Sequence, residues 1–122
     1  MNTQAKNTLL IVDDDEVVIV LMKNLFEKKY NVFTANDGIE ALSHLSQGVM
    51  PDLIISDLMM ENITGYEFIR QLFTNTLYKR IPVIVVSSSP VTELSEEFPS
   101  LQFVNKPFDP AVLANLVEAS RE

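Results

Sequence analysis

The chain has 122 residues, of which 47% are hydrophobic and 21% are charged, and these are ordinary proportions for a globular protein with one domain. The formal net charge of −8 argues against nucleic-acid binding by this domain, because contacts with phosphate backbones need clusters of lysine and arginine. The chain contains no cysteine, which excludes disulfides and thiolate metal sites and fits a cytoplasmic protein. No apolar stretch approaches the length that spans a membrane.

Short apolar runs alternate with helical patterns along the chain. The apolar runs lack polar alternation and are bounded by turn residues, which is typical of buried strands. The predicted strands cover residues 8–12, 31–35, a run that begins at 53, 82–87 and 102–106. The predicted helices cover residues 16–29, 37 to about 47, 64–74, a short segment within 91–98 and a last helix that begins at 110. Each predicted strand is therefore followed by a predicted helix.

Helix-start signals mark several of these boundaries. Asp37 and Thr64 each stand three residues before a glutamate, which is the spacing of a capping box. A capping residue stands directly before proline at 89–90 and again at 109–110. His44 is expected on the exposed side of its helix. The first helix is expected to bury Val18, Leu21, Met22 and Leu25, and the last helix Val112, Leu113, Leu116 and Val117.

Five strand–helix pairs in alternation predict an α/β fold with a parallel sheet covered by helices on both faces. In such sheets, ligands bind beyond the carboxyl ends of the strands, near the point where the strand order reverses. The residues that directly follow each strand are therefore the candidates for chemistry. We expect a single domain over residues 1–122, with residues 1–7 as a flexible N-terminal tail.

Charged and hydroxyl side chains stand at the ends of four predicted strands, namely Asp13, Asp14, Asp15, Asp57, Ser87 and Lys106. A single acid after a strand is usually solvated or starts a helix. It is much less expected by chance that several carboxylates, a hydroxyl and an ammonium converge on one edge of the sheet. Crowded carboxylates repel one another unless a cation lies among them, and a ligand set made only of oxygen suits Mg²⁺. A metal beside a lysine is typical of phosphoryl transfer, in which a carboxylate can accept the phosphoryl group.

The sequence resembles the receiver domain of two-component response regulators over nearly its whole length. The matching residues are Val12-Asp13-Asp14, Asp57, Ser87 and Lys106-Pro107-Phe108. The resemblance implies a flavodoxin-like (βα)5 fold, doubly wound, whose five parallel strands have the order 2-1-3-4-5. It also implies a phosphorylation-dependent signalling domain that accepts a phosphoryl group on Asp57 from a sensor histidine kinase or a histidine phosphotransfer protein. The phosphorylated state is expected to be read by an output partner, and the chain is expected to be able to form a homodimer.

The resemblance also implies how this site holds Mg²⁺. Asp14, Asp57 and the backbone carbonyl of Met59 would ligate the ion, with Asp13 acting through a water molecule. The expected catalysis is limited to Mg²⁺-dependent self-phosphorylation from a phosphohistidine donor and to autodephosphorylation.

Further roles implied by the resemblance concern the phosphoryl group and the response to it. Ser87 would contact one phosphoryl oxygen and Lys106 another. Phe103 stands at the family's switch-aromatic position, so Ser87 and Phe103 form the expected switch. The peptide bond between Lys106 and Pro107 is expected to be cis.

The chain departs from the family pattern at two places. Met60-Glu61 stands where Met-Pro is usual, and Pro99-Ser100 stands where a Gly-Ala pair commonly precedes the last strand. The second departure predicts a short or irregular fourth helix.

Three alternative functions compete with a phosphorylated receiver. The first is a degenerate receiver that binds partners without being phosphorylated. The second is a phosphatase of the haloacid dehalogenase type, with Asp13 as the nucleophile and Asp15 as the acid, although the chain is too short for the cap region of that family. The third is a flavodoxin, whose first loop should offer hydroxyls and backbone N–H groups to a phosphate rather than three carboxylates. Mg²⁺-dependent phosphorylation, and the identity of the aspartate that is phosphorylated, distinguish these functions.

Overall fold

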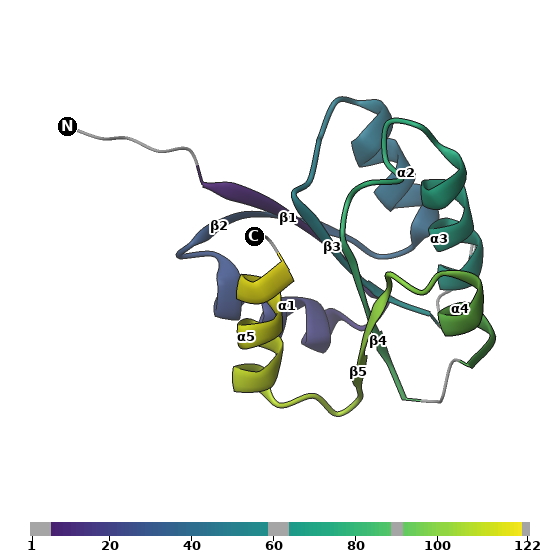
Figure 1. Cartoon of the computed structure of the whole chain (residues 1–122). Coiled ribbons are helices and arrows are strands. Elements are labelled where there is room, and N and C mark those ends of the chain that lie inside the picture. The colour runs from purple at the N-terminus through teal and green to yellow at the C-terminus, as the bar shows by residue number, and fades with distance from the viewer. Residues whose placement is uncertain (1–5, 59–63, 89–91, 121–122) are drawn as a thin grey trace.

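The structure is a computed structural model of the chain, and it describes residues 6–58, 64–88 and 92–120 (Figure 1). Within these ranges, ten elements alternate between strand and helix, as the sequence predicts. The strands are β1 (Asn7–Val12), β2 (Tyr30–Ala35), β3 (Leu53–Asp57), β4 (Val83–Ser87) and β5 (Gln102–Asn105). The helices are α1 (Glu16–Phe26), α2 (Gly38–Ser46), α3 (Gly65–Thr74), α4 (Thr92–Glu97) and α5 (Pro110–Ser120). β1 thus begins at Asn7, the last residue of the expected tail.

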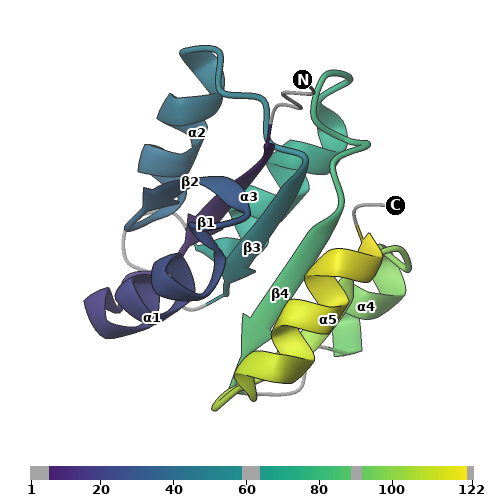
Figure 2. The same cartoon turned by 90° about the vertical axis from the view of Figure 1, so that its left-hand side faces the viewer.

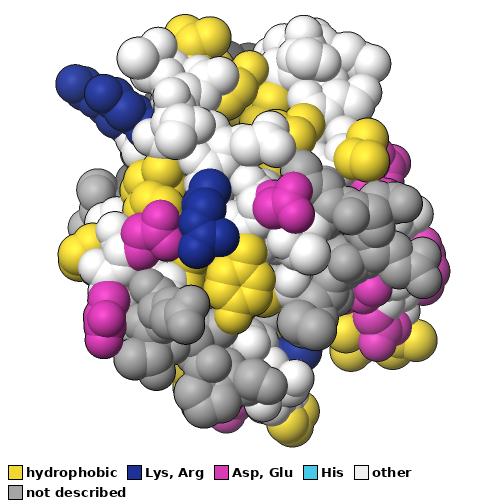
Figure 3. Space-filling view, turned by 90° about the vertical axis from the view of Figure 1, so that its right-hand side faces the viewer, with side chains coloured by type: hydrophobic (Ala, Val, Ile, Leu, Met, Phe, Trp, Pro, Cys, Tyr) yellow, Lys and Arg dark blue, Asp and Glu magenta, His cyan; other side chains and the backbone are white. Residues whose placement is uncertain are grey.

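The five strands form one parallel sheet in the order β2-β1-β3-β4-β5, which confirms the predicted order. α1 and α5 cover one face of the sheet, and α2, α3 and α4 cover the other (Figures 1 and 2). The surface on the side of α2, α3 and α4 mixes hydrophobic, acidic and a few basic side chains (Figure 3). The strand order reverses between β1 and β3. Folds of this kind bind ligands beyond the carboxyl ends of the strands, next to this reversal.

Two hydrophobic cores lie on opposite faces of the sheet, because successive side chains of a strand point to opposite faces. One core joins alternate strand residues to Ile19, Met22 and Phe26 of α1 and to Leu113 and Val117 of α5. The other joins the remaining strand residues to α2, α3 and Leu94 of α4. β3 and β4 are buried along their whole length, which explains their continuous apolar sequences.

The buried face of α1 agrees with the predicted one at Met22 and in part at Val18, and differs from it elsewhere. The helix buries Ile19, Met22 and Phe26, whereas Leu21 is 56% exposed and Leu25 is 37% exposed. Apolar residues occupy several sides of this helix, so the helical period alone fits more than one buried face. The helix also ends at Phe26 and not at residue 29, because a turn is needed to bring Tyr30 into β2.

The predicted helix starts are confirmed at Asp37 and Thr64. The Asp37 side chain accepts a hydrogen bond from the backbone N–H of Glu40, and Thr64 accepts one from the N–H of Glu67. The predicted cap at 89–90 lies outside the described residues. α4 is short, as predicted. In the part of the chain that the structure describes, every helix is too short or too polar to cross a membrane.

Two side chains lie in places that the sequence did not predict. His44 is half-buried rather than exposed, since its Nε2 lies 2.9 Å from the carbonyl oxygen of Thr34 and its ring packs on the edge of Phe33. Val112 of α5 is 55% exposed, while Leu113 and Val117 are buried as predicted. The buried apolar stripe of α5 is therefore narrower than the sequence pattern indicates.

Candidate functional site

The register of the sheet brings the strand ends together at one edge. Val12 pairs with Ser56, so β1 reaches the edge beside the end of β3. Asp57 pairs with Val86 and Ser87 pairs with Asn105, so β4 and β5 end at the same level. The polar residues that follow these pairs must therefore lie next to one another.

Buried polar residues are confined to this edge within the described ranges. They are Asp13, Ser56, Asp57 and Ser87, and each is at most 6% exposed. In the same ranges, every buried side-chain oxygen or nitrogen has a hydrogen-bond partner. Burial of a polar group is costly without such a partner, so the concentration of these groups at one edge indicates a functional site rather than incidental packing.

Asp13, Asp14 and Asp57 form a cluster of carboxylates. Each contributes one oxygen, and these oxygens lie within 4.8 Å of one another. Asp13 and Asp57 are buried, whereas Asp14 is exposed and leaves the cluster open to solvent. Three negative charges at this distance repel one another, which makes a bound cation favourable.

Lys106 partly neutralises the cluster. Its Nζ lies 3.0 Å from Oδ2 of Asp13 and 3.4 Å from Oδ2 of Asp57. The backbone N–H of Lys106 donates to the carbonyl oxygen of Ser87 at 2.8 Å, which fixes the start of this side chain at the end of β4. The peptide bond between Lys106 and Pro107 is cis, as predicted.

The two groups of this ion pair have shifted pKa values. Burial raises the pKa of the Asp13 carboxyl, and the hydrogen bonds from the Asp15 amide and from Lys106 offset only part of that rise. Burial alone would lower the pKa of the Lys106 ammonium, but its contacts with Asp13 and Asp57 outweigh that effect and the pKa is raised. The lysine is therefore positively charged at neutral pH, whereas the charge on Asp13 is energetically costly.

Backbone amides orient the two buried carboxylates. The N–H of Asp15 donates to Oδ1 of Asp13 at 2.9 Å, and the N–H of Leu58 donates to Oδ1 of Asp57 at 2.8 Å. The N–H of Asp13 donates to the carbonyl oxygen of Ala35 at 3.0 Å, which ties the loop after β1 to the end of β2. Each carboxylate is thus oriented by a backbone amide that follows it in the chain, and the loop after β1 is also tied to β2.

The structure brings together most of the residues that the sequence singled out. Asp13, Asp14, Asp57 and Lys106 are in one cluster, and Ser87 is buried at the same edge. Phe103 is half-buried on β5, where it packs against the core on the side of α2, α3 and α4. Met59 lies outside the described residues. Sequence reasoning missed Leu58, whose backbone amide carries no signal in the residue type.

The donor set fits a hard divalent cation such as Mg²⁺. Carboxylate oxygens with no histidine or cysteine among them are the ligands that Mg²⁺ prefers, and it usually keeps several water molecules. Asp13, Asp14 and Asp57 are the described side chains that would hold the ion. A bound Mg²⁺ would neutralise negative charge at this edge of the sheet.

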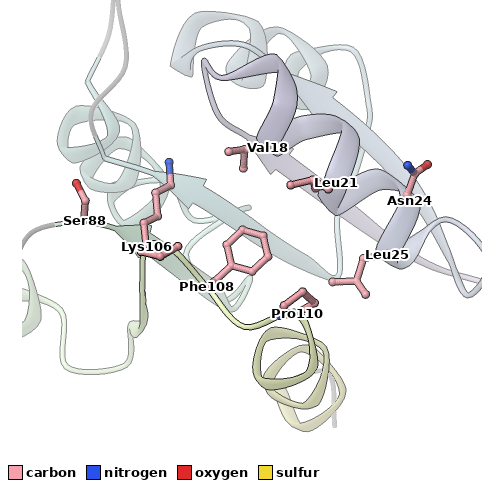
Figure 4. A pocket seen from close by; sticks show the side chains of 9 residues that line it. Val18, Leu21, Asn24, Leu25, Ser88, Lys106, Phe108 and Pro110 are labelled. Carbon is pink, nitrogen blue, oxygen red and sulfur yellow. The ribbon is translucent and has the colours of Figure 1, made fainter.

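An apolar groove of about 640 Å³ adjoins this cluster (Figure 4). Val18 and Leu21 of α1 face the ring of Phe108 across the groove, and Lys106 stands at one end of it (Figure 4). The exposed side chains of Leu21 and Leu25 therefore line the groove and do not point into the core. Exposed apolar surface of this kind often marks a binding face.

The fold and the site together define a doubly wound α/β domain with an acidic cluster and a lysine at the carboxyl edge of its sheet. The family model described as "Response regulator receiver domain" matches residues 9–118. The chain therefore belongs to the family of response regulator receiver domains.

Individual relatives agree with this assignment. The chain is 33% identical to the two-component response regulator ORR6 of Oryza sativa subsp. japonica, over 97% of this chain and 73% of that protein. It is 33% identical to the alkaline phosphatase synthesis transcriptional regulatory protein PhoP of Bacillus subtilis, over 91% of this chain and 47% of that protein. Among solved structures, the chemotaxis response regulator CheY4 of Vibrio cholerae has a TM-score of 0.84 and 28% identity, over 95% of this chain and 99% of that one. The chain spans about half the length of several curated relatives that it matches.

Proposed function

We propose that this domain is a phosphorylation-dependent switch of a two-component system in which Asp57 accepts the phosphoryl group. The observation that carries the proposal is the surroundings of Asp57, where Lys106 lies 3.4 Å away and two further carboxylates lie within 4.8 Å. A carboxylate that is buried only for packing needs neither a nearby lysine nor two neighbouring carboxylates. Membership in the receiver family supports the same role.

The proposed reaction transfers a phosphoryl group from a phosphohistidine. A carboxylate oxygen of Asp57 forms a bond with phosphorus while the bond between phosphorus and the imidazole nitrogen breaks. The imidazole leaves with the electron pair of that bond and takes up a proton from solvent. Hydrolysis of the aspartyl phosphate returns the carboxylate and releases inorganic phosphate, so the catalysis is limited to self-phosphorylation and autodephosphorylation.

Each remaining residue of the site has a proposed role. Asp14, Asp57 and the backbone carbonyl of Met59 would ligate Mg²⁺, and Asp13 would act through a water molecule. Ser87 and Lys106 contact phosphoryl oxygens. The position of Lys106 between Asp13 and Asp57 supports its role, because charge neutralisation by placed groups is the main requirement of phosphoryl transfer.

The donor is a sensor histidine kinase or a histidine phosphotransfer protein, and we propose that it docks beside α1. The donor imidazole has to reach Asp57, so the docking surface must border the cluster. Val17, Val20 and Leu21 are each more than half exposed on α1, and the groove between α1 and Phe108 begins at Lys106. A protein partner is the expected occupant of an apolar surface next to the site. Such a donor places the reaction in the cytoplasm.

The response to phosphorylation is proposed to pass from Ser87 to Phe103. Ser87 would move toward the new phosphoryl oxygens, and Phe103, which pairs with Val85 in the sheet, would turn as the neighbouring space changes. Phe103 has no hydroxyl, so packing alone sets the position of its ring. The output partner that reads this surface is a different protein or a second copy of the chain.

Phosphorylation with acetyl phosphate and Mg²⁺, followed by mapping of the modified residue, tests the proposal. We expect one phosphorylated residue, Asp57, and no labelling of Asp57→Asn. Modification of Asp13 would instead favour the phosphatase hypothesis. No labelling of the wild-type chain, and no binding of beryllofluoride, would favour a degenerate receiver.

A further inference from the structure

The peptide bond between Asp57 and Leu58 is held from three directions. Its N–H group donates to Oδ1 of Asp57 at 2.8 Å, so the peptide itself orients the carboxylate. Its carbonyl oxygen accepts a hydrogen bond from Oγ of Ser56 at 2.9 Å. Gly65, the first residue of α3, packs directly against the same carbonyl group. Any movement of this peptide therefore changes the direction of the Asp57 carboxylate.

Gly65 occupies a position with no room for a side chain. A Cβ atom built on it would lie 2.3 Å from the carbonyl oxygen of Asp57 and 2.5 Å from Cα of Leu58. Both atoms belong to the backbone, so neither can move without moving the peptide. The N–H of Gly65 also donates to the carbonyl oxygen of Leu58 at 3.0 Å, which fixes the start of α3 on the strand end.

Ser56 is a polar residue in an otherwise apolar buried strand. It is fully buried, and the residues before it are Leu53, Ile54 and Ile55. A hydroxyl at such a place is costly unless it makes a hydrogen bond. Its Oγ donates a hydrogen bond to the carbonyl oxygen of Asp57, on the opposite side of the peptide from the N–H group that binds the carboxylate. The hydroxyl thus supports the one peptide on which the acceptor depends.

We propose that Gly65 and Ser56 are positioning residues that fix the Asp57–Leu58 peptide and thereby aim the phosphoacceptor carboxylate. This inference rests on the proposed function of Asp57. Gly65 acts by its lack of a side chain, because only a residue without Cβ permits α3 to approach the backbone of β3 so closely. Ser56 acts through its hydrogen bond. Neither residue touches the phosphoryl group or the metal.

Two variants at these positions and one control test the proposal. Gly65→Ala forces the peptide to move, and Ser56→Ala removes its hydrogen bond without adding atoms. Val117→Ala is the control, because it truncates a fully buried side chain of α5 in the core on the face of α1 and α5. All three variants are compared with the wild type for thermal unfolding, so that loss of stability is measured separately.

The first readout needs neither metal nor phosphoryl donor. The backbone amide of Leu58 gives a nuclear magnetic resonance signal whose chemical shift reports its bond to Asp57. We expect this signal to shift in Gly65→Ala and Ser56→Ala and to stay in place in Val117→Ala. An unchanged signal in both site variants would overturn the proposal. If Gly65→Ala does not fold, Ser56→Ala alone decides.

The second readout is the rate of phosphorylation by acetyl phosphate. We expect the maximal rate to fall by about tenfold or more in Gly65→Ala, as is typical when a supporting residue of a site is displaced. Ser56→Ala should lower it by a factor of about 2 to 10, which is the range for loss of one hydrogen bond. KM for acetyl phosphate should change little, and Val117→Ala should keep the wild-type rate. Equal rates in all four proteins would overturn the inference.

The two proposals fail in different ways. A wild-type chain that is not phosphorylated on Asp57 would overturn the proposed function, and the Leu58 signal would still decide whether Gly65 and Ser56 position the carboxylate. A phosphorylated wild type with unaffected variants would overturn only the positioning role.

Discussion

The charge on Asp13 costs the metal-free protein stability, although the carboxylate has two strong partners. It is 1% exposed, it accepts a hydrogen bond from the Asp15 amide, and Lys106 lies 3.0 Å away. Burial nevertheless raises the pKa of Asp13, so the partners compensate only part of the cost of removing the charge from water. The site is therefore built for a further cation, and the fold tolerates the cost.

A neutral residue at position 13 is expected to stabilise the metal-free protein at neutral pH. The folded-state pKa of Asp13 lies above the ordinary value of 3.8, so the folded state binds more protons than the unfolded state between these two pKa values. The free energy of unfolding therefore falls as pH rises from the ordinary pKa through the folded-state pKa. Asp13→Asn removes that penalty and keeps an oxygen for the Asp15 amide. Its Tm without Mg²⁺ should exceed that of the wild type at pH 7, with a smaller excess near pH 4.

Thermal unfolding in a metal chelator at both pH values checks this prediction. Asp52→Asn is a matched control, because the Asp52 side chain is exposed and accepts a hydrogen bond from the backbone N–H of Thr8. A lower Tm of Asp13→Asn at pH 7 would mean that the ion pair with Lys106 outweighs the cost of burial.

α4 has only six residues, and side chains of α3 hold its C-terminal end. Nη2 of Arg70 lies 2.8 Å from Oε1 of Glu97, and its Nε donates to the same carboxylate at 3.2 Å. The rings of Phe73 and Phe98 stack with centroids 4.4 Å apart. Figure 3 shows this side of the molecule, where basic side chains lie among acidic and hydrophobic ones. A helix this short has little stability of its own, so these contacts set its position.

The aromatic stack is expected to matter more than the ion pair for this position. Arg70 and Glu97 are both more than 40% exposed, and exposed pairs contribute about 0.2 to 1 kcal/mol. Phe98→Ala removes a large apolar contact and should cost about 2 kcal/mol or more, whereas Arg70→Ala should cost less than about 1 kcal/mol. Chemical denaturation gives both values. The exchanged pair Arg70→Glu with Glu97→Arg should recover most of the loss of the single variants, and a larger loss in Arg70→Ala than in Phe98→Ala would contradict this account.

The exposed apolar side of α1 is expected to affect transfer from a protein donor and not from a small molecule. Leu21→Glu adds a charge to the groove beside Lys106, and Leu21 is too exposed for the change to disturb the core. Transfer from a phosphorylated histidine phosphotransfer protein should slow by about tenfold, while phosphorylation by acetyl phosphate stays at the wild-type rate. Val112→Glu on α5 is the control at an equally exposed apolar position. Equal slowing with both donors would place the effect at Asp57 and not at docking.

Much of the fold and site follows from the sequence, because parallel strands bring their carboxyl ends to one edge whatever the details of packing. Asp13, Asp57, Ser87 and Lys106 could be grouped for that reason alone. Their distances from one another depend on register and could not be predicted. The buried face of α1 was predicted only in part: Met22 is buried as predicted, but Ile19 takes the place of Leu21. Leu21 and Ile19 fit the helical period equally well, and only the position of the sheet decides between them.

The roles of Gly65, Ser56 and Leu58 could also not be predicted from the sequence. Gly65 is needed because α3 approaches the backbone of β3, and this approach is a tertiary distance rather than a turn preference. The amide of Leu58 has the same chemistry in every residue except proline. Ser56 gave a weak signal as a hydroxyl in an apolar run, but its partner became clear only from the structure.

Mg²⁺ is expected to stabilise the whole domain through the acidic cluster. Asp13, Asp14 and Asp57 repel one another without a cation, and a ligand that binds only the folded state adds about 2.7 kcal/mol of stability at a hundredfold excess over Kd. Asp14 is exposed, so Asp14→Ala should change the metal-free Tm little while removing the increase caused by Mg²⁺. Melts with MgCl₂, compared with NaCl of equal ionic strength, separate binding from screening of surface charge. An equal Mg²⁺-dependent rise in Tm for the wild type and Asp14→Ala would show that the ion binds elsewhere on this acidic protein.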